Sequence, residues 1–122
     1  MTLIVKSCDA ADEVWPLPGG VRLELARLGG VTIGRGTAEP GWCSSKHVRP
    51  IAGGASCEMI HVGVIVSGRE AVRMAVGTEA ELRPGDAFLV GAGHDAWVVG
   101  DEPCVSLDLI GGFADLALDR PN

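Results

Sequence analysis

Turn-forming residues recur so often along this sequence that no long helix or strand fits between them. Nowhere do apolar residues keep the helical period of about 3.6 residues over three turns. Short strands separated by turns roughly every 8–12 residues are typical of a β-sandwich or β-barrel, so the sequence predicts an all-β fold. The turns draw on 18 glycines and 7 prolines, and the clearest lie at residues 29–30, 39–41, 53–54, 67–68, 77–78, 83–86, 91–93 and 100–103.

The expected strands lie between these turns. Residues 21–27 alternate apolar with charged side chains, which is the period-two pattern of a half-buried strand. Residues 2–5 form a short apolar run that we expect at a sheet edge, and residues 9–18 are expected to be irregular because they carry charges and two prolines. Further strands are expected at residues 31–37, 42–47, 55–66, 70–76, 80–82, 87–90, 94–99 and 104–110.

A chain of 122 residues is long enough for one domain with one core. We expect residues 1–20 to form an N-terminal arm, residues 21–110 a barrel, and residues 111–122 a C-terminal tail. No linker or low-complexity segment divides the chain.

Charge and hydropathy exclude several classes of partner. A net charge of −6 makes the chain a poor candidate for binding nucleic acid or an anionic membrane surface. The longest uncharged apolar runs are about 8 residues, far short of the roughly 20 that span a bilayer. The N-terminus lacks the pattern of a signal peptide, and the four cysteines include no closely spaced pair. We therefore expect a cytoplasmic protein with reduced thiols and no membrane partner.

The three histidines are the first hint of a site. Each lies at a strand-like position beside a turn, and they are His47, His61 and His94. A hairpin centred on Gly53-Gly54 would set His47 opposite His61. Because His94 follows another glycine-rich turn, all three imidazoles could converge on one centre.

At this point the sequence resembles small bacterial cupins. The resemblance rests on His61-x6-Gly68, on the turn Arg83-Pro84-Gly85-Asp86, and on Gly91-Ala92-Gly93-His94, and it covers roughly residues 31–109. It implies a double-stranded β-helix, or jelly-roll, barrel with one metal-binding pocket, and a homodimer.

The motifs depart from the usual cupin pattern in ways that bear on the ligands. His61 stands where the family usually has Glu, and Cys57 falls where the second histidine of the first motif is expected. The histidine of the second motif usually lies at the position of Ala96, two residues after His94. The metal ligands suggested by the family spacing therefore differ from those suggested by turn chemistry.

Two ligand sets remain open. Turn chemistry at Gly53-Gly54 favours His47, His61 and His94, whereas the family spacing favours Cys57, His61 and His94. A straight strand would hold Cys57 about 13 Å from His61, so the second set requires a turn between them. Either set suits a divalent transition metal, with Zn favoured and Fe, Ni or Cu possible.

The function that we expect from these residues is metal binding in a small cupin barrel. A metalloenzyme acting on a small organic molecule is the favoured interpretation, of lyase, isomerase, cyclase or dioxygenase type, and no catalytic residue is assigned because the fold hosts all of these reactions. The alternative is a barrel that binds or senses a small ligand without chemistry. We also expect a homodimer, because the apolar run at residues 2–5 would otherwise leave an unpaired edge.

Overall fold

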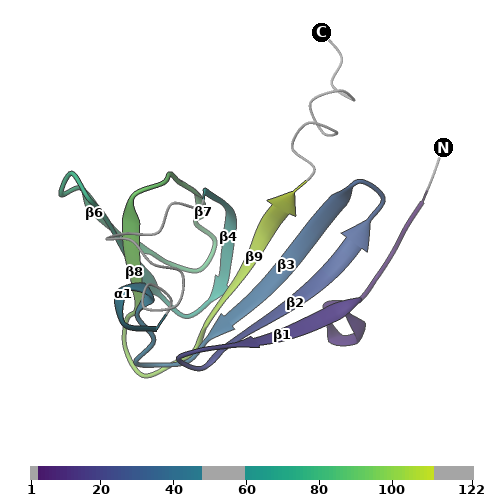
Figure 1. The fold of residues 1–122 in the computed structure, drawn as a ribbon, viewed down its shortest axis with the longest axis horizontal. Coiled ribbons are helices and arrows are strands. Elements are labelled where there is room, and N and C mark those ends of the chain that lie inside the picture. The colour runs from purple at the N-terminus through teal and green to yellow at the C-terminus, as the bar shows by residue number, and fades with distance from the viewer. Residues whose placement is uncertain (1–2, 48–59, 112–122) are drawn as a thin grey trace, which may run out of the picture.

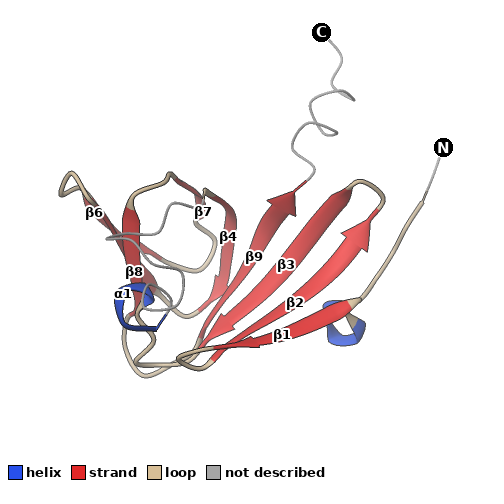
Figure 2. Ribbon diagram, in the orientation of Figure 1, coloured by secondary structure: helices blue, strands red, loops and turns tan. Residues whose placement is uncertain are grey.

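Two antiparallel sheets face each other in the computed structural model, which describes residues 3–47 and 60–111 (Figures 1 and 2). The larger sheet has, in spatial order, β1 (Glu13–Leu17), β2 (Val21–Leu28), β3 (Val31–Ala38), β9 (Cys104–Gly111), β4 (His61–Ser67) and β7 (Ala87–Val90). The smaller sheet has the order β6 (Glu79–Leu82), β5 (Glu70–Met74) and β8 (His94–Val98). The only helical elements of the described residues are the 3-10 turn η1 (Cys8–Ala10) and α1 (Ser44–His47).

The chain passes repeatedly from one sheet to the other. It leaves the larger sheet after β4, returns to it at β7, leaves again for β8 and returns at β9. In Figure 1 the larger sheet runs from β1 to β9, and its far end, at β4 and β7, curls round toward β8. This winding confirms the predicted all-β double-stranded β-helix.

The core lies between the smaller sheet and the β9–β4–β7 part of the larger one. Side chains alternate along each strand, so one set points inward from each sheet. Ile65 of β4 is the most deeply buried, with 1% of its surface exposed. The other buried members of the core are Val72, Val90, Ala96, Val98 and Cys104, and the larger residues packed against them include Trp42, Leu82 and Phe88.

Gly68 shows why one predicted turn requires glycine. It ends β4 with a positive φ of 74°, a conformation that side chains with a Cβ rarely adopt. A Cβ there would also collide with the carbonyl oxygen of Pro103 and lie 2.7 Å from Cys104 Cα. The turn therefore lets the start of β9 approach β4 closely.

The expectation of a strand at residues 42–47 is wrong, because α1 occupies most of that range. Trp42 and Cys43 still join the smaller sheet's border, where Cys43 bridges Trp97 of β8. The chain then turns into α1, and the Asp95 carboxylate accepts a 2.9 Å hydrogen bond from the Ser45 amide. A side-chain acceptor of this kind stabilises the first turn of a helix. No helix in the described parts of the chain is long and apolar enough to cross a membrane.

The N-terminal arm also differs from expectation. Residues 13–17 of the segment expected to be irregular form strand β1, which pairs with β2 through the turn at Gly19 and Gly20, both with positive φ. Pro16 is tolerated because β1 is an edge strand. Conversely, Leu3, Ile4 and Val5 form no strand, so the expected edge strand at residues 2–5 is wrong for those that the structure describes.

Candidate metal and ligand site

His61 and His94 come together between the two sheets. His61 is the first residue of β4 and His94 the first of β8. Their ring centroids lie 5.0 Å apart, with the rings nearly perpendicular at 74°. The inward alternation of β4 and β8 positions both side chains, because His61 shares a face with Ile65 and His94 shares a face with Ala96.

The hydrogen bonding of His94 fixes which of its nitrogens can bind a ligand. Its side chain is buried, and its Nδ1 lies 2.7 Å from the carbonyl oxygen of Gly91. A carbonyl oxygen only accepts, so Nδ1 carries the proton and the lone pair is on Nε2. Histidines that bind metals commonly donate the other N–H to a carbonyl in this way. The glycine-rich turn before β8 thus orients His94 as a donor of its Nε2 lone pair.

His61 lies beside an acidic residue but is neutral at physiological pH. Its Nδ1 is 3.8 Å from Oδ2 of Asp108 on β9. Burial, with a smaller contribution from His94, holds the pKa of His61 below its ordinary value of 6.5. Lowering this pKa favours the neutral imidazole, so the contact with Asp108 is not primarily an ion pair at neutral pH.

Asp108, on the neighbouring strand β9, is a half-buried carboxyl group beside His61. Burial raises its pKa above the usual range, and a hydrogen bond from the Ser106 side chain partly opposes that shift. Its Oδ1 is buried and has no hydrogen-bond partner among the described residues. It occupies the space above Gly63, directly across the sheet on β4, where an added Cβ would lie 2.7 Å from Oδ1. An orphaned acceptor of this kind is costly unless something binds it.

Two further titratable groups lie deeper in the same interior. Burial, and then the charge of Asp108, raise the pKa of Glu70 on β5 to about 7. Burial, and then Glu70 and Asp108, raise the pKa of the Cys104 thiol to about 12. Cys104 is therefore a protonated, unreactive thiol at neutral pH, whereas Glu70 can gain or lose a proton there.

The structure does not bring the third predicted histidine to this pair. His47 is the last residue of α1. Its Nδ1 lies 3.1 Å from both the amide nitrogen and the carbonyl oxygen of Cys43. Its ring packs against Gly19. Cys57 and the hairpin glycines Gly53 and Gly54 lie outside the described residues. Among the described residues, no group of three or more His, Cys, Asp or Glu side chains is placed to hold a metal ion. Both ligand sets therefore stay predictions.

The described residues nevertheless fit part of a metal site. Two imidazoles face one interior, one of them oriented by a backbone carbonyl, and a carboxyl oxygen of Asp108 without a hydrogen-bond partner among the described residues lies near the other. Nitrogen and carboxylate donors of this kind suit Zn and related divalent ions. His61 and His94 would hold the ion, with Asp108 near them.

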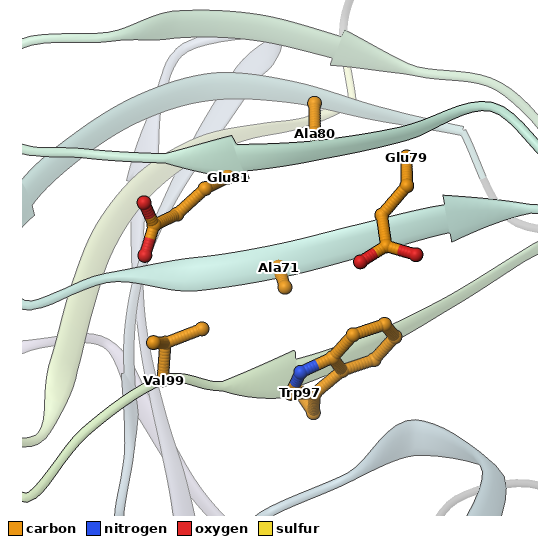
Figure 3. Close-up of a pocket in the computed structure, with 6 residues that line it drawn as sticks. All are labelled: Ala71, Glu79, Ala80, Glu81, Trp97 and Val99. Atoms are coloured by element: carbon orange, nitrogen blue, oxygen red, sulfur yellow. The ribbon is translucent and has the colours of Figure 1, made fainter.

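A surface hollow lies elsewhere, on the outer face of the smaller sheet (Figure 3). Its side chains are those of Ala71, Glu79, Ala80, Glu81, Trp97 and Val99. The carboxylates of Glu79 and Glu81 reach across β5 toward Trp97 and Val99. Each is already paired with arginine, Glu79 with Arg73 at 2.9 Å. The carboxylates of the hollow are therefore already engaged in ion pairs, and the interior stays the candidate site.

Strand alternation in the sequence carries a signal for Asp108 and Glu70. Glu70 shares its strand face with Val72, and Asp108 shares one with Cys104, whereas Leu107 lies on the opposite face. Acidic residues in phase with core residues are candidates for an interior site, but alternation alone does not say which face is inside.

Comparison with solved structures supports the same fold. An uncharacterised conserved protein with a double-stranded β-helix domain from Klebsiella pneumoniae is 19% identical, with a TM-score of 0.59 over 88% of this chain and 83% of that protein. KdgF from Halomonas sp. is 18% identical, with a TM-score of 0.54 over 80% and 84% of the two chains. A cupin-like protein from Thermotoga maritima is 14% identical, with a TM-score of 0.55 over 80% and 74%. The chain therefore has the small cupin fold.

Sequence comparison adds no closer relationship. No protein-family profile matches the chain, and no curated protein sequence matches it either. At identities below 20% the structural likeness defines the fold and leaves the chemistry to the site itself.

Proposed function

We propose that this protein binds a divalent transition metal, with Zn favoured, inside the barrel through His61 and His94. The observation that carries the proposal is the hydrogen bond from His94 Nδ1 to Gly91, which presents the Nε2 lone pair in an interior shared with His61. His94 is buried, and its Nδ1–H already has a partner in Gly91, so a cation at Nε2 would complete its polar contacts.

The surrounding residues favour chemistry on a small organic molecule. A bound metal ion supplies a Lewis acid that polarises a substrate oxygen. Burial keeps His61 neutral and therefore ready to bind without first losing a proton. Glu70, with a pKa of about 7, can hold or release a proton at neutral pH, as a general acid or base must. Together these features support a metalloenzyme, whose partner is a small substrate.

A second candidate is a barrel that binds a small ligand without metal or chemistry. The absence of a three-donor group among the described residues favours it. In that case His61 and Asp108 would bind polar groups of the ligand directly, and the orphaned Asp108 Oδ1 would accept a hydrogen bond from it.

Metal-dependent thermal stability distinguishes the two candidates. An ion that binds only the folded chain raises the melting temperature. We expect Zn to raise it at pH 7.5 and to have little effect at pH 5, because protons compete for the imidazoles at the lower pH. A chelator should reverse the effect at pH 7.5.

Single substitutions then locate the ion. His61→Ala and His94→Ala should each abolish the Zn-dependent shift, and a shift that survives both would contradict the proposal in favour of the metal-free barrel. His47→Ala and Cys57→Ser serve as a matched pair, because each removes one candidate third ligand. The variant that loses the larger part of the shift identifies that ligand.

A further inference from the structure

Trp42 brings an unpaired hydrogen-bond donor into the interior of the barrel. Its indole Nε1 is buried and has no hydrogen-bond partner among the described residues. The ring packs against both halves of the core, the cluster that contains Val98 and the cluster that contains Ala96. A buried tryptophan normally gives its N–H a partner, because an unpaired donor loses the hydrogen bond that it makes in water. The Trp42 N–H therefore needs an acceptor from outside the described residues.

Strand pairing sets Trp42 in the same row of side chains as Glu70. Cys43 bridges Trp97, which lies on the outer face of β8, and the Trp42 carbonyl accepts a 3.1 Å hydrogen bond from the Val98 amide. On the other side of β8, Val98 is paired with Glu70 of β5. Glu70, Val98 and Trp42 therefore point inward side by side, with the backbones of Glu70 and Trp42 about 10 Å apart, which is two strand spacings.

The opposite sheet supplies an unpaired acceptor in the same interior. Asp108 Oδ1 is buried without a hydrogen-bond partner among the described residues. The charge of Asp108 contributes to raising the pKa of Glu70, so these two carboxyl groups lie close enough to interact. Because Asp108 also lies beside His61, the polar groups of the interior continue from the histidine pair to Glu70 and Trp42.

The two carboxyl groups lack a lysine or arginine partner among the described residues. Only burial and Asp108 shift the pKa of Glu70, and only burial and Ser106 shift that of Asp108. Arg69 and Arg73, the arginines closest to Glu70 in the sequence, pair with glutamates of β6 instead. An anionic group would meet like charge here without a counter-ion, in a site where burial already disfavours charge. The indole N–H is an uncharged donor, which suits a carbonyl or hydroxyl oxygen.

We infer that Trp42 is a substrate-binding residue, whose indole N–H donates a hydrogen bond to an uncharged carbonyl or hydroxyl oxygen at the end of the ligand that reaches Glu70. The inference rests on the proposed function, because it concerns the organic molecule bound in that same interior. It narrows the substrate to molecules that are neutral at this end. Leu82 and Phe88, which pack against both halves of the core, offer apolar contacts to the carbon skeleton.

Proton–nitrogen NMR of the full chain, kept metal-free by a chelator, tests the inference. The chain has three tryptophans, so Trp42→Phe identifies the indole signal of Trp42 while keeping an aromatic ring in the core. Isobutyramide and isobutyrate are the probes, because they share a carbon skeleton and differ in charge. We expect isobutyramide to move the Trp42 indole signal, and isobutyrate to bind at least about 10-fold more weakly.

Two tryptophan variants separate the hydrogen bond from the packing. Trp42→Phe removes the donor, and its affinity for isobutyramide, read from the backbone amides of β8, should be about 5-fold lower than that of the wild type, the effect of one neutral hydrogen bond. Trp97→Phe is the matched control, because it makes the same change on the outer face of β8. It should leave the affinity unchanged.

Three results would overturn the inference. A Trp42 signal that neither probe moves excludes a ligand at this donor, and a nuclear Overhauser contact with bound water would then assign its partner. Binding of isobutyrate as tight as that of isobutyramide contradicts an uncharged ligand. An equal loss of affinity in Trp97→Phe and Trp42→Phe means that the N–H of Trp42 makes no specific bond.

The Zn-dependent rise in melting temperature, measured without probes, keeps this inference separate from the metal site. If Zn stabilises the chain and the Trp42 signal does not respond to isobutyramide, the role of Trp42 is wrong and the metal site stands. If Trp42 responds and Zn has no effect, the metal site is wrong and Trp42 binds the ligand of a metal-free barrel.

Discussion

Strands β4 and β9 have two faces of opposite character. On the inner face His61, Asp108 and Ser106 bring polar groups between the sheets, whereas on the outer face Val64 and Leu107 lie side by side with no polar neighbour on either strand. A sheet that faces water on one side usually has the reverse arrangement, with apolar residues inside and polar residues outside. The inner face of these two strands thus combines polar groups with the core residues Ile65 and Cys104, whereas the outer face is aliphatic.

The smaller sheet differs from these two strands on its outer face. Its inner face carries Val72 and Ala96, both buried, and its outer face carries the ion pairs of Arg73 and Glu79. Both sheets contribute to the site, His61 and Asp108 from the larger sheet and His94 and Glu70 from the smaller one.

The largest effect that we expect comes from the position that makes room for Asp108. Gly63→Ala would push a methyl group into the carbonyl oxygen of Leu107 and within 2.7 Å of Asp108 Oδ1. Overpacking against backbone cannot relax easily, and we expect a loss of about 2–3 kcal/mol in the free energy of unfolding, measured by urea denaturation. Gly91→Ala is the matched control, since a Cβ there meets no atom within 4 Å and the residue lacks a positive φ. Equal destabilisation by the two substitutions would contradict the close packing of β4 on β9.

A smaller effect should follow from the buried carboxyl group of Glu70. Its pKa is raised from 4.5 to about 7 in the folded chain, so between these values the folded state binds more protons than the unfolded state. The stability of the metal-free protein should therefore fall as pH rises from about 5 to 8. Glu70→Gln removes this titration, and we expect the stability of this variant to fall by about 1–2 kcal/mol less than that of the wild type over that range.

The effect of His61 has the opposite sign and a different pH window. Its pKa is lowered, so it reduces stability only as pH falls below about 6.5.

Glu79→Gln is the control for Glu70→Gln, because Glu79 lies on the outer face of the same sheet in an exposed ion pair. If Glu79→Gln flattens the profile as much as Glu70→Gln does, the proton is not held in the interior.

The fold was more predictable from sequence than the site. Turn residues such as Gly68 and the alternation of β2 report local backbone requirements, so most strands are found within a few residues. The prediction failed at residues 42–47, where α1 depends on Asp95, a partner about 50 residues away in the sequence. No local pattern specifies a contact of that separation.

The pairing of His61 with His94 was predictable because each follows a turn at the start of a strand, on a face that carries core residues. The roles of Asp108 and Glu70 were not, since their significance depends on burial and on each other's charge. Those quantities arise only when two sheets pack together. Sequence periodicity identifies which residues share a face, and packing decides which face is inside.

The titration of the three histidines by NMR, with and without Zn, tests the central claim most directly. The chain has only three histidines, so each ring resonance can be assigned with one alanine variant. Without metal, His61 should titrate below its ordinary pKa of 6.5 because of its burial beside His94. With Zn bound, the His61 resonance should no longer change between about pH 6 and 8, and addition of Zn should move the His94 resonance, because the ion binds a ring nitrogen of each. A His61 that titrates at or above 6.5, or that titrates identically with and without Zn, would contradict a metal site on the inner face.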